Sequence, residues 1–386
     1  MNFKVAEGIV GISVHDKEIA RFEGQYPVPD GITYNSWVIE DDQTILLDTA
    51  DSAFTGCWLR ELSAVLGEKK PDKLVISHVE PDHSGSIAAF VEAYPDVTLV
   101  GNAKTFAMLD QFFPQPVKAA RQIVKDGDVL ETANHRLRFV FAPMVHWPEV
   151  MLAFDEATGT LFSADAFGTF GALERIGGWT DEARRYYGNI VGKYGAQVQA
   201  VLKKAAQLPV KRLCPLHGPV LEEQAMSEAL ASYEKWSAWQ PESDGTLIVC
   251  AGFHGHTLAA AERIRSELTA AGREAALVDL TAEDKSYAVG LAFRYGRIVL
   301  AATTYDGAYA PAMEAFISSM KMKGLQNRLF GLVENGTWAP MAAKQMAAAL
   351  EGLKNCRVLE EKVTLRSAMN AKNEEEIRAL CEALYA

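Results

Sequence analysis

Short apolar runs separated by turn residues make up the first part of the chain and predict strands. Residues 33–40 and 44–48 flank Asp41 and Asp42, a pattern typical of a β-hairpin. Apolar residues at helical spacing predict a helix over 53–66. We expect antiparallel strands interspersed with helices to form a layered α/β domain. Further strands are predicted at 74–76, 97–100, 136–142 and 151–154, with a second helix at 85–94.

The pattern changes after residues 231–246, where an apolar helix end is followed by a predicted linker from Pro241 to Gly245. Regular alternation of strands and helices then predicts a doubly wound parallel sheet. We therefore expect two domains, one over residues 1–240 and one over residues 246–386. The strands of the second are predicted at 247–250, 274–280, 297–302 and 328–333, with a helix at 258–271.

Composition narrows the class of protein. With 386 residues, of which 49% are hydrophobic and 23% charged, the chain is typical of a globular protein with more than one domain. Its net charge of -12 argues against nucleic acids and anionic membranes as partners. No apolar stretch is long enough to span a bilayer, so we expect a soluble cytoplasmic protein.

The five cysteines are scattered along the chain and form no Cys-x-x-Cys pair. This spacing argues against a disulfide framework and against an iron or zinc centre held by four cysteines. Most of the thiols are expected to be small buried side chains.

Four ligand-type side chains follow the apolar run 74–76 within a few residues. His78, Glu80 and Asp82 alternate, so an extended backbone would direct all three to one side. His83 follows directly, and Gly85 would let the chain turn away. Any two of these residues alone would be solvated loop residues, but four at this spacing favour a metal site.

Three more ligand candidates each follow an apolar strand. They are His146, Asp165 and His217. A single histidine or aspartate in such a position is more often structural than a ligand. Because three of them accompany the cluster at residues 78–83, the metal interpretation is favoured.

Three loops of the second domain follow predicted strands, where doubly wound sheets bind ligands. The loop 252–257 lies between a strand and a helix, so its backbone N–H groups and a hydroxyl could hold a phosphate. The loops 303–309 and 334–340 carry Tyr305, Tyr309 and Trp338, which could stack on an isoalloxazine ring or serve as packing residues.

The metal-ligand pattern resembles the diiron domain of the flavodiiron proteins, also called A-type flavoproteins. Supporting segments are 146–148, 161–168 and 182–190. The three loops resemble the phosphate loop and the two flavin-ring loops of flavodoxin-like FMN domains. This resemblance covers nearly the whole chain, and it implies a metallo-β-lactamase-like αββα sandwich followed by a flavodoxin-like doubly wound parallel sheet.

The resemblance also implies a ligand set. His78, Glu80 and His146 would bind one iron, Asp82, His83 and His217 the other, with Asp165 as the bridge. Family members differ in whether the side chain at His83 is coordinated. Zinc hydrolases of the same fold usually carry histidine where Glu80 stands, and a carboxylate there suits iron better.

The FMN loops depart from the family in one respect. Gly252 and His254 replace the usual hydroxyl or other common residues, so phosphate binding would rest on backbone amides, Thr257 and His256. The implied FMN-binding residues are Phe253, His254, Gly255, His256, Thr257, Thr304, Tyr305, Asp306, Gly307, Asn335, Gly336, Thr337, Trp338 and Ala339.

The implied activity is transfer of electrons from FMN to a diiron centre that reduces O2 to water, NO to N2O, or both. The resemblance does not choose between the gases; we expect activity toward both, with O2 as the leading substrate. Because no cysteine-rich module follows the FMN domain, we expect a separate donor such as rubredoxin. The resemblance also implies a head-to-tail homodimer or a dimer of dimers. An apolar pocket over the metals would include Trp147 and Tyr187, with Phe167, Phe170 and Tyr186 as further candidates; all could instead be core residues. The alternatives are a zinc hydrolase fused to a flavodoxin-like electron carrier, and a binding protein without metals.

Overall fold

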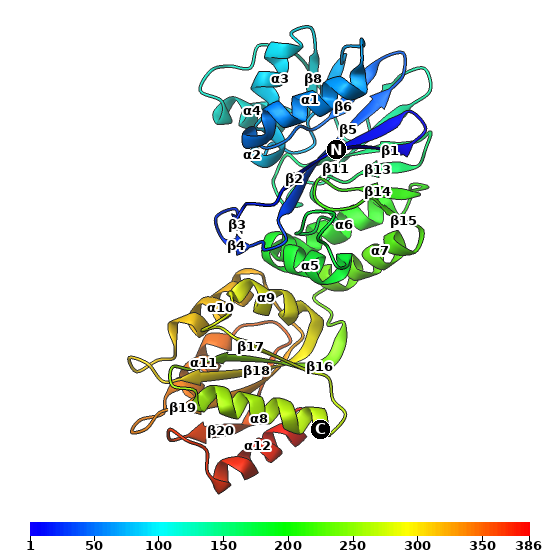
Figure 1. The fold of residues 1–386 in the computed structure, drawn as a ribbon. Coiled ribbons are helices and arrows are strands. Elements are labelled where there is room, and N and C mark those ends of the chain that lie inside the picture. The colour runs from blue at the N-terminus through cyan, green and yellow to red at the C-terminus, as the bar shows by residue number, and fades with distance from the viewer. The chain divides into compact units, whose positions relative to one another are not determined.

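The computed structural model describes residues 1–386, which form two compact units (Figure 1). The first unit contains residues 1–183 and 194–234, and the second contains residues 184–193 and 235–386. The short segment 184–193 is thus grouped with the second unit, whereas the sequence assigned it to the first domain. The boundaries 1–240 and 246–386 stay a prediction. None of the helices has the length and apolar character that crossing a membrane requires.

Two large sheets and a small hairpin form the first unit. The seven-stranded sheet has the order β1-β2-β5-β6-β7-β8-β9, and the six-stranded sheet runs from β10 to β15 in sequence order. The predicted hairpin is confirmed, because β5 and β6 pair antiparallel with Glu40 opposite Thr44. The strands are β1 Asn2–Ala6, β2 Ile9–Asp16, β3 Arg21–Phe22, β4 Tyr26–Pro27, β5 Ile32–Glu40, β6 Thr44–Leu47, β7 Lys73–Val75, β8 Thr98–Gly101, β9 Ala120–Ile123, β10 Val129–Glu131, β11 Arg136–Phe141, β12 Met151–Asp155, β13 Thr160–Phe162, β14 Arg212–Cys214 and β15 Leu221–Glu222.

Both large sheets are mixed, because parallel pairs accompany the antiparallel strands that the sequence predicts. Strands β6 to β9 pair in parallel, as do β13 and β14. Parallel neighbours need a crossover, which helices supply here. The helical segments are η1 Ser52–Phe54, α1 Thr55–Leu66, α2 Pro81–Ser84, α3 Ile87–Ala93, α4 Ala103–Phe112, α5 Trp179–Tyr186, η2 Tyr187–Val191, η3 Gly192–Tyr194, α6 Gly195–Ala205 and α7 Glu223–Ser237.

The two large sheets pack face to face. One buried cluster joins residues such as Trp37 and Val75 of the first sheet to Phe139, Met151 and Phe162 of the second. Helices α1, α3 and α4 lie outside the first sheet and α6 and α7 outside the second (Figure 1). The predicted αββα sandwich is therefore confirmed.

The second unit is a five-stranded parallel sheet in the order β17-β16-β18-β19-β20, the flavodoxin-like order. Helices α8 and α12 share one face, where α8 side chains such as Ile264 pack with Val299 and Leu380. The predicted linker is shorter than expected, because Ser243 already pairs with Tyr295. The elements are β16 Ser243–Ala251, α8 His256–Ala270, β17 Ala275–Asp279, α9 Lys285–Arg294, β18 Tyr295–Thr303, α10 Pro311–Met322, β19 Leu329–Asn335, α11 Ala342–Leu350, β20 Arg357–Leu365 and α12 Ala371–Ala383.

Helix α9 and the segment 184–193 approach closely within the second unit. A Cβ atom at Gly290 would lie 2.9 Å from Cα of Arg185, and one at Gly188 would lie 3.1 Å from the Phe293 ring. Asn189 Nδ2 donates to the carbonyl oxygen of Ser286 at 3.0 Å. Glycine is therefore required at position 290 by packing.

Replacing Gly290 with alanine should lower the free energy of unfolding by about 1–3 kcal/mol, because backbone atoms must move to admit the methyl group. Gly56 in α1 is the matched control, since its nearest neighbour is the Arg60 Nη1 atom at 3.9 Å. Gly56→Ala should leave the protein equally stable or raise stability by about 0.5 kcal/mol. Urea unfolding of both variants measures the difference, and equal effects would contradict the close approach.

Candidate metal and flavin sites

The cluster at residues 78–83 follows the carboxyl end of β7 and is held there by Asp48. Oδ1 of Asp48 accepts hydrogen bonds from the backbone N–H of Ser77 at 2.8 Å and of His78 at 3.3 Å. Asp48 follows β6, the parallel neighbour of β7. The strand-end loop is therefore fixed by the strand beside it.

The sequence predicted an extended backbone across the cluster, and this prediction is wrong for Asp82 and His83. The chain is extended at Glu80, but α2 begins at Pro81, so Asp82 and His83 lie on a helical turn. Gly85 is helical and does not turn the chain away. Its role is close packing, because a Cβ atom there would lie 2.5 Å from the carbonyl oxygen of Pro81.

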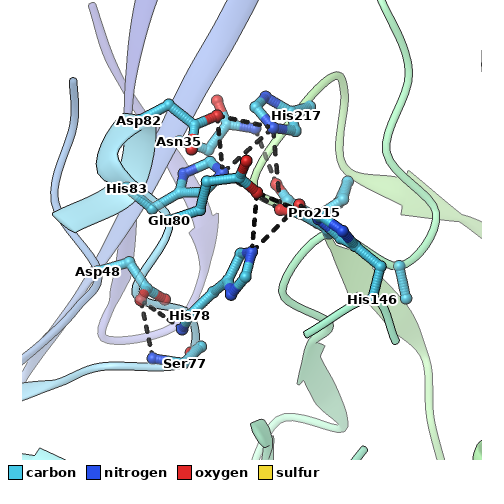
Figure 2. Close-up of polar contacts among 12 residues, drawn as sticks. Asn35, Asp48, Ser77, His78, Glu80, Asp82, His83, His146, Pro215 and His217 are labelled. Atoms are coloured by element: carbon cyan, nitrogen blue, oxygen red, sulfur yellow. Dashed lines mark hydrogen bonds and ion pairs between the residues drawn. The ribbon is translucent and has the colours of Figure 1, made fainter. Parts of the chain in front are cut away.

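The first group of ligand atoms comes from His78, Glu80, His146 and Asp165. Nε2 of His78 lies 3.1 Å from Oε2 of Glu80, and Nε2 of His146 lies 3.2 Å from the same oxygen. Figure 2 shows these side chains converging from the β7 loop and from the segment after β11. Such an arrangement could hold one metal ion.

The second group comes from Asp82, His83 and His217. Nε2 of His83 and Nε2 of His217 lie 3.1 Å apart, and each is 3.3 Å from Oδ2 of Asp82. His83 therefore points into the group in the same manner as His217 (Figure 2).

Asp165 faces both groups. Its Oδ2 lies 3.1 Å from Nε2 of His146, and its Oδ1 lies 3.2 Å from Nε2 of His83. One carboxylate with an oxygen toward each group is the arrangement that a bridging ligand requires. All seven predicted metal-ligand side chains are thus brought together, although their roles as ligands stay a prediction.

Several supporting residues were missed from the sequence. Nδ1 of His78 lies 2.7 Å from Oε1 of Glu149, and Nδ1 of His217 lies 2.7 Å from the carbonyl oxygen of Thr33. Asn35 Nδ2 donates to the carbonyl oxygens of Pro215 and Gly218, which fixes the His217 loop against β5. Among these supporting residues, only Glu149 could have been suspected from the sequence, because it lies three residues after the candidate ligand His146.

Glu23, in the β3–β4 hairpin, was also missed. Desolvation of its carboxyl first, and the neighbouring charge of Glu80 second, raise the pKa of Glu23 to about 7. A carboxyl with such a pKa can hold a proton beside the metal-ligand side chains at neutral pH.

Opposite charges balance one another inside the cluster. Burial alone would lower the pKa of His146, but hydrogen bonds with Asp165 and Glu80 outweigh burial and raise it to about 9. Burial would raise the pKa of Asp165, yet the charge of His83 and the hydrogen bond with His146 hold it well below its usual range. A divalent cation can replace the imidazole protons in this balance.

The buried polar atoms of the cluster fit a metal. Both carboxylate oxygens of Asp82, Nδ1 of His83 and Oδ1 of Asp165 make no hydrogen bond although they are buried. Buried polar atoms without hydrogen bonds are costly, and coordination of a cation would satisfy the carboxylates. Carboxylates mixed with imidazoles suit iron.

A cavity of about 550 Å³ lies beside His146 and is lined largely by apolar side chains, including Phe112 and Trp147. The two rings stack with centroids 5.9 Å apart, and Trp147 also packs edge-on against His78. Of the aromatic residues proposed for a pocket, Trp147 lines this cavity.

The other proposed pocket residues are buried. Phe170 packs against Phe22, whose ring meets His217 edge-on at 5.4 Å, while Phe167 stacks on Tyr233. Tyr186 and Tyr187 are fully buried, and Tyr187 packs against Trp236 and Phe293 in the second unit. For Tyr187 these contacts favour the packing role that the sequence also allowed.

The second unit carries a cavity of about 550 Å³ at the carboxyl ends of β16, β18 and β19. Phe253, Tyr305 and Trp338 are exposed there, with Trp338 exposed to 89%. Every predicted FMN-binding residue except Gly255 lines this cavity, and Tyr309 does not. The lining residues missed from the sequence are Thr303, Met341 and Ser367.

The phosphate loop ends at the N-terminus of α8. Gly255 adopts φ 80°, which favours glycine, and precedes the first helical residue, His256. Oγ1 of Thr257 lies 3.0 Å from Oγ1 of Thr303 and accepts a hydrogen bond from Asn335 Nδ2 at 3.3 Å. The cavity lining contains no lysine or arginine, so an anionic group would depend on backbone amides, Thr257 and the histidines.

Solved structures share this architecture along the whole chain. A flavodiiron protein from Giardia intestinalis matches with a TM-score of 0.90 and 22% sequence identity, covering 100% of this chain and 99% of that chain. The rubredoxin oxygen:oxidoreductase from the anaerobe Desulfovibrio gigas matches with a TM-score of 0.90 and 23% identity, covering 100% and 98%. At this identity the likeness establishes the fold.

Sequence comparison identifies relatives. A family model described as ODP family beta lactamase matches residues 32–218. A putative diflavin flavoprotein A 3 from Nostoc sp. is 32% identical over 289 residues, covering 72% of this chain and 49% of the relative. An anaerobic nitric oxide reductase flavorubredoxin from Vibrio vulnificus is 27% identical, covering 86% of this chain and 70% of the relative. The chain belongs to the flavodiiron family.

This flavodiiron chain spans about half the length of the diflavin flavoproteins that it matches. The ligands and substrates of those longer proteins are therefore properties of those proteins and are only proposed for this chain.

Adding ferrous ion or zinc to the metal-free flavodiiron protein at pH 7 should release at least one proton per chain. His146 holds a proton below its pKa of about 9, and a metal at Nε2 displaces it. Metal affinity should therefore rise with pH up to about 9 and then level off as far as His146 is concerned. Calorimetry in buffers of different ionisation enthalpy measures the released protons, and binding without release would contradict this charge balance.

Proposed function

We propose that this flavodiiron chain is an oxidoreductase in which FMN in the second unit passes electrons to a diiron centre in the first. The observation that carries the proposal is the position of Asp165, with one oxygen toward each of two ligand groups. Two metals joined by a carboxylate suit reactions that require more than one electron. The chemistry supplied by the bound groups is electron transfer from FMN to two irons and reduction of O2 or NO there.

The proposed ligand assignment follows the two groups. His78, Glu80 and His146 would hold one iron, Asp82, His83 and His217 the other, and Asp165 would bridge them. The orientation of His83 into its group supports coordination of this side chain. Glu80 supports iron over zinc, because a carboxylate makes the first group richer in oxygen. A zinc hydrolase or a metal-free binding protein is therefore not favoured.

FMN is proposed for the cavity of the second unit. Its volume of about 550 Å³ lies within the range for cofactor sites. The N-terminus of α8, a helix of 15 residues, suits a phosphate, and the exposed Tyr305 and Trp338 could stack on the ring.

The residues around the metals would define how a small gas is bound. The largely apolar cavity at Trp147 offers an approach to His146, and a diatomic gas provides too few contacts for strong selection between O2 and NO. We propose activity toward both gases, with O2 as the leading substrate.

A separate electron donor of the rubredoxin type is also proposed. The names of two relatives, a flavorubredoxin and a rubredoxin oxygen:oxidoreductase, support this class of donor. The homodimer implied by the family resemblance stays a prediction, which light scattering of the purified protein would check.

Replacing Thr257 with valine should weaken FMN binding about tenfold, because a hydrogen bond to a charged phosphate contributes about 1.5 kcal/mol. Valine keeps the shape of threonine and removes the hydroxyl. The matched control is Thr246→Val, which removes a buried hydroxyl bonded to Tyr385 and outside the cavity. Quenching of FMN fluorescence measures both affinities; equal affinity in the Thr257 variant would contradict the proposed phosphate loop.

The central experiment compares the wild type with Asp165→Ala. The wild type should contain about two irons per chain and reduce O2 and NO with a reduced rubredoxin-type donor. Loss of the bridging carboxylate should remove or uncouple the irons and abolish gas reduction, while the FMN content stays unchanged and serves as the folding control. Metal analysis and gas-consumption rates measure these outcomes.

Three results would contradict parts of the proposal. Full iron content and full activity in Asp165→Ala would exclude the bridging role. Zinc in place of iron in the wild type would favour the hydrolase alternative. Rapid turnover of NO with none of O2 would overturn the substrate preference and leave the diiron proposal standing.

A further inference from the structure

Glu149 is a buried carboxylate outside the seven metal-ligand candidates. Its Oε1 lies 2.7 Å from Nδ1 of His78 and accepts a hydrogen bond from the backbone N–H of Val79 at 3.1 Å. The side chains of Glu149 and His78 are both fully buried. Because Nε2 of His78 faces the first ligand group, Glu149 fixes the orientation of the ring and puts a negative charge behind it.

The two ligand groups are otherwise matched in composition. Each has two imidazoles and one carboxylate of its own, and Asp165 faces both. The Nδ1 atoms of the second group have different neighbours from Nδ1 of His78. Nδ1 of His217 faces the neutral carbonyl of Thr33, and Nδ1 of His83 makes no hydrogen bond. Glu149 is thus a carboxylate in direct contact with the back of a ligand imidazole, and this contact distinguishes the first group from the second.

Asp48 is the other buried carboxylate near the cluster, and its hydrogen bonds differ in kind. It accepts from the backbone N–H groups of Ser77 and His78, which positions the loop. Its charge also acts on His83, but it makes no hydrogen bond with a ligand ring. Asn102 holds the backbone of Glu149, with Nδ2 donating to its carbonyl oxygen at 2.6 Å. The backbone of Glu149 is thus held by a residue outside the metal cluster.

We propose that Glu149 is a positioning residue that makes the His78 group bind its metal more tightly than the His217 group, so that the two metals bind in a fixed order. A carboxylate that accepts from Nδ1 raises the basicity of the imidazole and restricts its rotation. The negative charge also acts on the cation through a buried region, where screening is weak. The inference rests on the proposed function in that it takes the two groups to be metal sites.

The test titrates ferrous ion anaerobically into metal-free protein in the presence of a competing chelator. The wild type should show two steps. Glu149→Gln keeps the side-chain shape and an oxygen for His78 and Val79 but removes the charge. It should weaken the tighter step about 10- to 100-fold and leave the weaker step unchanged. Glu149→Ala, which also removes the hydrogen bonds, should lose at least as much.

Asp155→Asn is the matched control. Asp155 is a buried carboxylate whose Oδ2 lies 3.0 Å from Nδ1 of His135, and neither residue belongs to a ligand group. This variant should keep both binding steps. An unchanged tighter step in Glu149→Gln, or an equal loss in both steps, would overturn the inference.

A second measurement covers the case in which the Glu149 variants fail to fold. His217→Ala retains the group backed by Glu149, and His78→Ala retains the other. The first of these variants should hold ferrous ion more tightly, and the reverse order would overturn the inference. A wild type that binds zinc in two ordered steps but no ferrous ion would contradict the proposed function and support the binding order.

Discussion

The first unit must accommodate four imidazoles and three carboxylates at one place, and all of them except the partly buried Glu80 are buried. Buried charges are costly unless they are paired or bind a cation, and several atoms of this cluster make no hydrogen bond. The carboxylates and the protonated imidazoles balance one another in part, which raises the pKa of His146 and lowers that of Asp165. The buried carboxylates and imidazoles that make the cluster costly also suit it to bind divalent cations.

Both sheets are needed to hold this cluster. The residues at 78–83 follow β7 of the seven-stranded sheet, whereas Asp165 and His217 follow β13 and β14 of the six-stranded sheet. Asn35 and Thr33 of β5 bind the His217 loop through hydrogen bonds, so the sheets are linked at the site by polar contacts as well as by the apolar core. The sandwich thereby fixes the distance between the two ligand groups.

The second unit also places its candidate site at strand ends, but the side chains there differ from those of the metal cluster. Its cavity also lies at the carboxyl ends of parallel strands, but it is open, carries exposed aromatic rings and has no lysine or arginine in its lining. Backbone amides, hydroxyls and the two histidines of the lining would hold FMN together with the N-terminus of α8. The exposed edge of such a site would leave a bound flavin accessible to a donor.

The sequence by itself determined the two fold classes, the seven metal-ligand side chains that the structure brings together, and all but one of the predicted residues that line the flavin cavity. Strand ends, turns and ligand types are local patterns that short segments carry. The resemblance of these segments to the flavodiiron family implied the αββα fold, the ligand set and the FMN-binding residues. The sequence did not predict the parallel pairing of β6 to β9, the helical turn at Asp82 and His83, and the contacts of Glu149 and Asn35. These depend on which distant segments meet: Asn35 and Pro215, for example, are 180 residues apart and are joined by one hydrogen bond. The resemblance also implied how the ligands divide into two groups. Only the tertiary structure decided that the Glu149 carboxylate lies behind His78 of the first group, because this contact joins side chains 71 residues apart.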